Sequence, residues 1–170
     1  MSGVVFRPAG VYGPGDRRFL KLIKAINGRK FVMLGPGTVQ YQLVFIDDLI
    51  DGIVRCGTLQ NAPGNVYLLT GEAPVTLNNL VRLIAELLNV PPPRWHFPVA
   101  PVYAAGFLCE LLFKPLGINP PLYRRRVDFF RKTRAFDISK AKRELGFHPQ
   151  VGLQRGLTTT IEWYRRAGWL

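Results

Sequence analysis

Short apolar runs alternate along this chain with segments whose apolar residues recur every three or four positions. The runs are typical of strands, and the periodic segments are typical of helices with one buried face. In order, the runs are VVF, FVML, YQLVFI and NVYLLT. Such alternation favours an α/β fold over a helical bundle or a β-sandwich. The strands are short and the first has no crossover partner before it, so we expect residues 1–170 to form a single incomplete domain.

The first run ends in a loop that is rich in proline and glycine. It lies within VVFRPAGVYGPGD, residues 4–16. We expect a buried strand over Val4 to Phe6 that ends at Pro8. A strand that ends in such a loop usually brings its backbone close to a ligand. Asp16 can cap the helix that follows, and Gly28 can end it.

The formal net charge of +12 at pH 7 indicates a surface that attracts anions such as nucleotides, nucleic acids or acidic lipids. Six basic residues gather in one segment, with only Asp128 to oppose them. They are Arg124, Arg125, Arg126, Arg131, Lys132 and Arg134, called here the basic cluster. It could hold the phosphates of a small substrate, or bind single-stranded nucleic acid by charge and stacking. It could also be a solvated face with Phe129 and Phe130 packed inward.

Two motifs that suggest chemistry have simpler interpretations. Gly35 and Gly37 precede a strand, whereas a dinucleotide loop must lead into a helix, so we predict a hairpin turn there. Asp47 and Asp48 point in different directions at a helix start, so one of them is expected to cap that helix.

Histidine and cysteine give no catalytic or metal pattern. His96 and His148 have no nucleophile or acid at a local catalytic spacing and are expected in loops or packing. Cys56 and Cys109 lie in apolar segments and are expected to be reduced, buried residues. The N-terminal residues do not form a secretory signal, so we expect a cytoplasmic protein.

The apolar stretch from Val99 to Phe113 allows more than one interpretation. We expect a helix from Tyr103 to Phe113, because the prolines before it oppose helix formation. A buried helix, or one that covers a substrate, is the first interpretation. The stretch is shorter than a spanning helix, and an interfacial helix followed by basic residues is the alternative.

Three motifs in order resemble the extended short-chain dehydrogenases, also called the NAD-dependent epimerase/dehydratase family. The sequence RPAGVYGPGD is similar to the segment after the catalytic tyrosine and lysine of that family. MLGPGTVQYQLVFIDDLIDGI resembles its next signature, and RAFDISKAKRELGFHPQVGLQRGLTTTIEWYRRAGWL resembles its closing segment. The resemblance covers essentially the whole chain and identifies it as the C-terminal half of such an enzyme.

This resemblance implies the C-terminal part of a Rossmann-like fold with a small substrate-binding α/β subdomain. It also implies NAD or NADP as the cofactor, with the nicotinamide end near Pro8, Ala9, Gly10 and Val11. The glycine-rich pyrophosphate loop and the tyrosine followed four residues later by lysine are not found in the sequence. In the family the tyrosine exchanges a proton with a substrate hydroxyl, so we assign no catalytic residue and expect no activity from the chain alone.

The resemblance further implies a small-molecule substrate, either a nucleotide sugar or another secondary alcohol. Tyr12, Tyr41 and Arg126 are the expected substrate-binding residues. Tyr41 replaces the arginine of sugar-nucleotide members, and Arg126 lies near the place of a second phosphate-binding arginine. A steroid-like apolar alcohol is the alternative substrate. A non-catalytic module that binds RNA or acidic lipid through the basic cluster is the alternative function.

The expected partners are the missing N-terminal half or a separate chain that supplies it. In a complete sheet the strand over Val4 to Phe6 would be central, so its apolar faces and one backbone edge would be exposed in this chain. We therefore expect association at that edge, either as a homodimer or as aggregates.

Overall fold

The computed structural model of the chain describes residues 3–113 and 127–170. The helices are α1 (Arg17–Asn27), α2 (Ile46–Thr58), α3 (Leu77–Leu88), α4 (Val99–Phe113), α6 (Ser139–Leu145) and α7 (Leu153–Arg166), with a 3-10 turn, η1 (Asp128–Phe130). The strands are β1 (Val5–Pro8), β2 (Gly10–Tyr12), β3 (Met33–Leu34), β4 (Gln40–Tyr41), β5 (Leu43–Phe45), β6 (Val66–Leu69), β7 (Val75–Thr76) and β8 (His96–Phe97). The α/β class expected from the alternation is confirmed.

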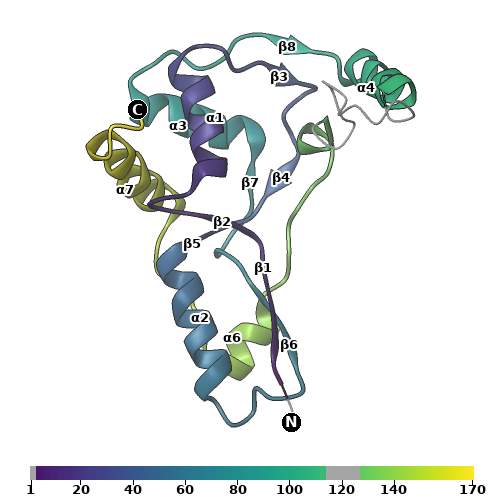
Figure 1. The fold of residues 1–170 in the computed structure, drawn as a ribbon. Helices are drawn as coiled ribbons and strands as arrows, with labels where there is room; N and C mark the ends of the chain where they lie inside the picture. The colour runs from purple at the N-terminus through teal and green to yellow at the C-terminus, as the bar shows by residue number, and fades with distance from the viewer. Residues whose placement is uncertain (1–2, 114–126) are drawn as a thin grey trace.

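Parallel pairing joins strands that are far apart in the sequence. β1 pairs with β6 and β2 pairs with β5, with Pro8 opposite Leu69 and Tyr12 opposite Phe45. β3 also pairs in parallel with β8, whereas β4 and β7 are antiparallel. Figure 1 shows β1 and β6 together at the narrow end that carries the N-terminus. The carboxyl ends of β1 and β6 therefore point towards the wider part of the molecule.

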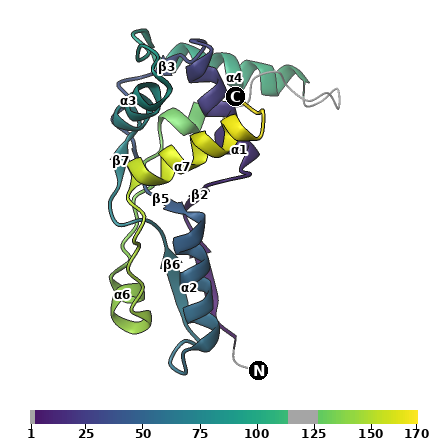
Figure 2. The same cartoon turned by 90° about the vertical axis from the view of Figure 1, so that its left-hand side faces the viewer.

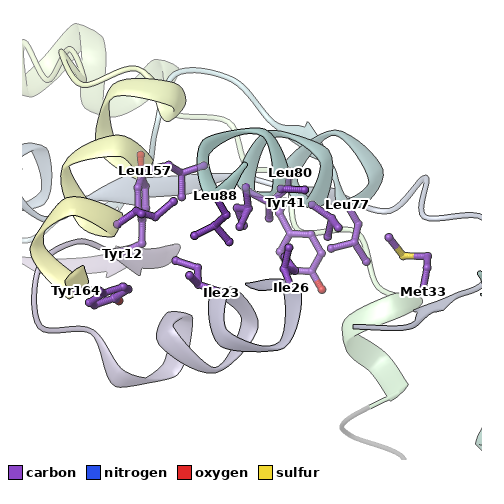
Figure 3. Close-up of a cluster of buried hydrophobic side chains, with 14 of the residues drawn as sticks. Tyr12, Ile23, Ile26, Met33, Tyr41, Leu77, Leu80, Leu88, Leu157 and Tyr164 are labelled. Carbon is purple, nitrogen blue, oxygen red and sulfur yellow. The ribbon is translucent and has the colours of Figure 1, made fainter. Parts of the chain in front are cut away.

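The larger hydrophobic core lies in the wider part, where α1, α3 and α7 gather (Figure 1). α3 contacts both of the other helices. Figure 3 shows apolar side chains from these helices converging with Tyr12 and Tyr41 of the strands. The residues that it labels are Tyr12, Ile23, Ile26, Met33, Tyr41, Leu77, Leu80, Leu88, Leu157 and Tyr164. The periodic apolar faces read from the sequence thus become one packed core.

A second, smaller core lies between α2, α6 and the β1–β6 pair. Its buried residues include Tyr67 and Leu69 of β6 and Phe147 after α6. On the other face of the pair, Val5 and its partner Val66 are 49% and 44% exposed. β1 is therefore not buried here, as expected for a strand that lacks its neighbours.

The predicted helix cap is present at Asp16 but not at the adjacent residues Asp47 and Asp48. The Asp16 carboxylate accepts hydrogen bonds from the backbone N–H groups of Arg18 and Phe19. The prediction that Asp47 or Asp48 caps α2 is wrong, because the N-cap is Phe45 and no side chain caps the helix. The Asp48 carboxylate instead accepts hydrogen bonds from the backbone N–H groups of Gln150 and Val151, in the loop before α7.

The glycine turn between β3 and β4 is present, but it does not close a hairpin. Gly35 and Gly37 have φ of 76° and 66°, a region that favours glycine. A strand follows the turn, as predicted, and not a helix. β3 and β4 pair with β8 and β7 rather than with each other, so the hairpin prediction is wrong. A side chain at position 37 would also collide with Asn78 at the start of α3.

α4 differs from its sequence prediction in both extent and burial. It begins at Val99, four residues before Tyr103, because Pro101 falls in the first turn, where no N–H is needed. Its buried residues are Gly106 and Glu110, and its leucines are exposed. The expectation of a buried helix is therefore wrong. Among the described residues, none of the helices has the length and apolarity to cross a membrane.

Candidate functional site

A cavity of about 340 Å³ lies beyond the carboxyl end of β1, between β2, α1 and the segment after η1. Ligands of parallel α/β folds bind at this end of the strands. Five parts of the chain line it: residues 9–11, the loop and α1 through Asp16, Arg18, Phe19 and Leu22, residues 41–43, Leu80 of α3, and the pair Phe129 and Arg134. The expected loop and the expected Tyr41 therefore meet in one cavity.

The loop after β1 is fixed by backbone contacts to neighbouring strands. The Ala9 N–H donates to the Leu69 carbonyl at 3.2 Å, which continues the β1–β6 pairing into the loop. A Cβ on Gly10 would lie 2.7 Å from the Leu43 side chain, so glycine permits the close approach of β2 to β5. Ala9, Gly10 and Val11 line the cavity. Pro8 does not, and instead lines a smaller cavity of about 200 Å³ with Thr70 and Phe136.

Tyr41 is buried and its hydroxyl lies in a short network. The hydroxyl donates a hydrogen bond to the Phe129 carbonyl. It also accepts one from Nη1 of Arg134, and this N–O distance is 2.7 Å. Burial raises the pKa of Tyr41 above its ordinary value, and the nearby Arg134 guanidinium opposes part of that rise. Tyr41 is therefore a neutral hydroxyl beside a permanent positive charge at neutral pH.

From the sequence, Arg134 was named only as one of the six residues of the basic cluster, and Arg126 was the arginine expected at the site. Its backbone N–H donates to the Gln40 carbonyl at 2.7 Å, and its carbonyl accepts from the Gln42 N–H at 3.0 Å. The Gln42 side chain, which is also buried, accepts from the Phe136 N–H and donates to the Gly71 carbonyl. These bonds hold the segment after η1 along β4 and place Arg134 in the lining of the cavity. Arg134 is separated from Tyr41 by most of the chain, and no local pattern could have paired them.

Tyr12, another expected substrate-binding residue, lies outside this cavity. Its ring is buried between Phe19 and Phe45, with ring centroids at 5.7 Å and 5.6 Å. Burial, together with the negative charge of Asp48, raises the pKa of its hydroxyl above the ordinary range. The hydroxyl end packs against Gly156 of α7. The structure thus places Tyr12 in the core, although it reaches a separate small cavity on the α7 side.

Arg126, the third expected substrate-binding residue, lies outside the described residues, as do Arg124 and Arg125. The described members of the basic cluster have different partners. Arg131 lies over the ring of Tyr103, 4.3 Å from its centroid, and Lys132 pairs with Asp128 at 2.7 Å. Among these three residues only Arg134 lines the cavity.

The aromatic residues of the same segment pack inward. The rings of Phe129 and Tyr41 lie 5.0 Å apart, and those of Phe130 and Phe31 lie 6.1 Å apart. Both phenylalanines pack against the larger core. This arrangement leaves them less available for the base stacking that nucleic-acid binding would use.

The described residues contain no group of three or more metal-ligating side chains that could hold an ion. Cys56 is buried in α2 and Cys109 is half-buried in α4. The polar side chains that line the site are Asp16, Arg18, Tyr41, Gln42 and Arg134, beside the backbone of residues 9–11 and apolar walls. Such a lining suits an organic ligand that carries a hydroxyl and an anionic group.

Residues 1–69 match the sequence profile of the NAD dependent epimerase/dehydratase family. The chain is similar to short-chain dehydrogenase/reductase family 42E member 1 of Xenopus laevis, at 32% identity over 96% of this chain and 44% of that protein. It is similar to the sterol-4-alpha-carboxylate 3-dehydrogenase (decarboxylating) of Saccharomyces cerevisiae, at 27% identity over 94% of this chain and 49% of that protein. The chain thus spans about half the length of the curated relatives it matches.

Two solved structures superpose on nearly the whole chain. The crystal structure of gox2253 gives a TM-score of 0.74 at 25% identity and covers 97% of this chain and 49% of that one. UDP-glucuronic acid 4-epimerase from Bacillus cereus, in complex with UDP-glucuronic acid and NAD, gives 0.67 at 23%, over 96% and 45%. The chain thus has an α/β fold that matches about half of each of these Rossmann-like structures. The chain belongs to the NAD-dependent epimerase/dehydratase family, the extended short-chain dehydrogenases.

Proposed function

We propose that this chain is the substrate-binding part, with one strand beside the cofactor, of an NAD-dependent enzyme that acts on a secondary alcohol. The convergence of residues 9–11, Tyr41 and Arg134 on one cavity is the observation that carries this proposal. We treat residues 1–170 as one incomplete domain. The segment with the glycine-rich loop and the catalytic tyrosine and lysine would come from another part of the protein or from a partner chain.

The cofactor would approach the loop after β1. When bound, NAD or NADP supplies or accepts a hydride, and the proposed contacts of its nicotinamide end are Pro8, Ala9, Gly10 and Val11. The close packing of Gly10 against Leu43 fits this role, because it fixes the backbone without filling the cavity. The chain's own contribution is to hold this backbone still and to exclude water with the apolar side chains around it.

The substrate would carry an anionic group as well as its hydroxyl. The Arg134 guanidinium uses Nη1 for the Tyr41 hydroxyl and the Lys132 carbonyl, and its Nε and Nη2 groups would meet a phosphate or a carboxylate. A nucleotide sugar offers phosphates, as does the UDP-glucuronic acid bound by a matching structure. A sterol carboxylate, named in the description of the yeast relative, offers a carboxylate on an apolar body. The apolar side chains of Phe19, Leu22 and Leu80 in the cavity lining support the sterol carboxylate as a second candidate substrate.

Binding measurements with the purified chain test the proposal. UDP-glucuronic acid and a water-soluble steroid carboxylate are titrated separately and followed by ligand-observed NMR, with wild type, Arg134→Gln and the control Arg131→Gln. Loss of a charged hydrogen bond costs about 1.5–3 kcal/mol, or roughly a 10- to 100-fold loss of affinity. For whichever of the two ligands binds, we expect Arg134→Gln to lose affinity by that factor and Arg131→Gln to keep the affinity of wild type. Equal affinities for both variants would overturn the assignment of Arg134, and no binding of either ligand would overturn the substrate class.

A further inference from the structure

The helix α4 presents its apolar side to solvent and its charged residue to the protein. Glu110, its only charged residue, is 8% exposed, and Gly106 is also buried. Leu108, Leu111 and Leu112 are 55%, 59% and 64% exposed. A surface helix of a globular protein normally has the opposite arrangement. α4 therefore exposes an apolar surface that contact with another apolar surface would remove from water.

The exposed residues of α4 share one continuous face. Successive residues of a helix are about 100° apart, so Leu108, Leu111 and Leu112 fall within one half of its circumference. Ala104 and Ala105 are exposed on that same half. This half of the α4 surface contains no charged or hydrogen-bonding side chain, so its side chains form no hydrogen bonds with water.

Two aromatic residues shortly before the helix are also exposed. Trp95 is 75% exposed and Phe97, in β8, is 50% exposed. We call the combined surface the α4 patch, which consists of Trp95, Phe97, Phe107, Leu108, Leu111 and Leu112. Figures 1 and 2 show α4 at the margin of the molecule, beyond the body formed by α1, α3 and α7. A patch at the margin can reach a flat surface without obstruction from the rest of the chain.

The charges around the α4 patch are positive. Arg94 precedes Trp95, and the Arg131 guanidinium lies over Tyr103 of α4 itself. The nearby carboxylate of Asp128 is paired with Lys132, and Glu110 is buried. The whole chain carries a formal charge of +12. An apolar face with a basic border matches a surface that is anionic outside and apolar beneath.

We propose that the α4 patch docks on the surface of an anionic lipid membrane. The leucines enter the region between headgroups and acyl chains, Trp95 lies at the headgroup level, and Arg94 and Arg131 meet lipid phosphates. RNA is the competing partner, because Trp95, Phe97 and Phe107 of the patch carry rings for base stacking, whereas its three leucines carry none. This role is independent of the cavity, because none of the residues that line the cavity belongs to α4.

Co-sedimentation with vesicles tests the proposal. Vesicles of phosphatidylcholine alone and of phosphatidylcholine with phosphatidylglycerol are mixed with wild type, Leu111→Asp/Leu112→Asp and the control Ile50→Asp/Val54→Asp. Ile50 and Val54 of α2 are 53% and 54% exposed, so the control adds the same charge at a similar exposure on another element. We expect binding to the anionic vesicles, an affinity at least tenfold lower for the α4 variant, and a control close to wild type.

A second readout follows Trp95 directly. Its emission should shift to shorter wavelength on the anionic vesicles, and Trp95→Phe should abolish that shift. Arg94→Glu/Arg131→Glu should weaken binding and reduce its salt dependence without disturbing the fold. Equal binding by the α4 and α2 variants would overturn the proposal. Binding to RNA but not to vesicles would also overturn it, as would an oligomer that Leu111→Asp/Leu112→Asp dissolves while wild type ignores the vesicles.

Discussion

Asp48 shows how a single buried carboxylate links two distant elements. It lies in the first turn of α2, is 6% exposed, and accepts hydrogen bonds from the N–H groups of Gln150 at 2.8 Å and Val151 at 3.1 Å. These residues precede α7, so the carboxylate joins the smaller core to the larger one. Asp47, its exposed neighbour, makes no such bond with the loop.

We predict that Asp48→Asn lowers the free energy of unfolding by about 2 kcal/mol, because an amide replaces one of the two acceptor oxygens and removes the charge. Asp47→Asn is the matched control and should cost no more than about 0.5 kcal/mol from the helix dipole. Urea unfolding of both variants and wild type measures the difference. Equal destabilisation by the two substitutions would contradict the role given to Asp48.

The sequence could predict the role of Asp16 but not that of Asp48. Asp16 bonds with residues two and three positions ahead, so the local pattern contains the whole interaction. The partners of Asp48 lie about 100 positions away, and only the tertiary fold brings them together. Tyr41 was expected at the site from the family resemblance, whereas Arg134 was known only as a member of the basic cluster, because the hydrogen bond between the two spans 93 positions of sequence.

At the scale of elements, α7 depends on a glycine where it crosses the strands. A Cβ at Gly156 would lie 2.3 Å from the Tyr12 hydroxyl and 3.0 Å from the Phe45 ring. We predict that Gly156→Ala lowers the free energy of unfolding by about 1–3 kcal/mol, because the helix must move away from the β2–β5 pair. Gly57→Ala in α2, where a Cβ meets nothing within 4 Å, should instead stabilise by about 0.5–1 kcal/mol. Thermal unfolding of the two variants gives the sign of each change, and a stabilising Gly156→Ala would refute the packing argument.

Periodicity predicted the helices well because their apolar faces are buried in the cores. α1, α3 and α7 all follow the expected spacing, and Gly146 ends α6 in the left-handed conformation. α4 could not be placed in the same way, because its apolar residues are spread around the helix and Glu110, its one charged residue, faces the protein rather than solvent. Strand partners were also hidden, since β3 and β4 look like a hairpin locally and yet pair with β8 and β7.

At the scale of the whole molecule, the fold is open at β1. One edge of β1 pairs with β6, and its other edge has no strand partner within the described residues. Val5 N–H donates to the Asn65 carbonyl, so the next N–H, that of Phe6, points towards the open edge. The apolar side chain of Val5 is 49% exposed beside it. An open, apolar strand edge is a template for pairing with another chain.

We predict that the purified chain associates through the open edge of β1 in a concentration-dependent way. Val5→Lys should shift the protein towards monomer, because a charged side chain on an edge strand opposes pairing. Val54→Lys in α2, where the valine is 54% exposed, introduces the same residue at a similar exposure and should leave association unchanged. Sedimentation velocity over a range of concentrations measures the shift, and amide exchange should be slower in residues 4–6 of the associated form than in the Val5→Lys monomer. A monodisperse wild-type monomer with slow exchange in residues 4–6 would show that the edge is already satisfied within one chain.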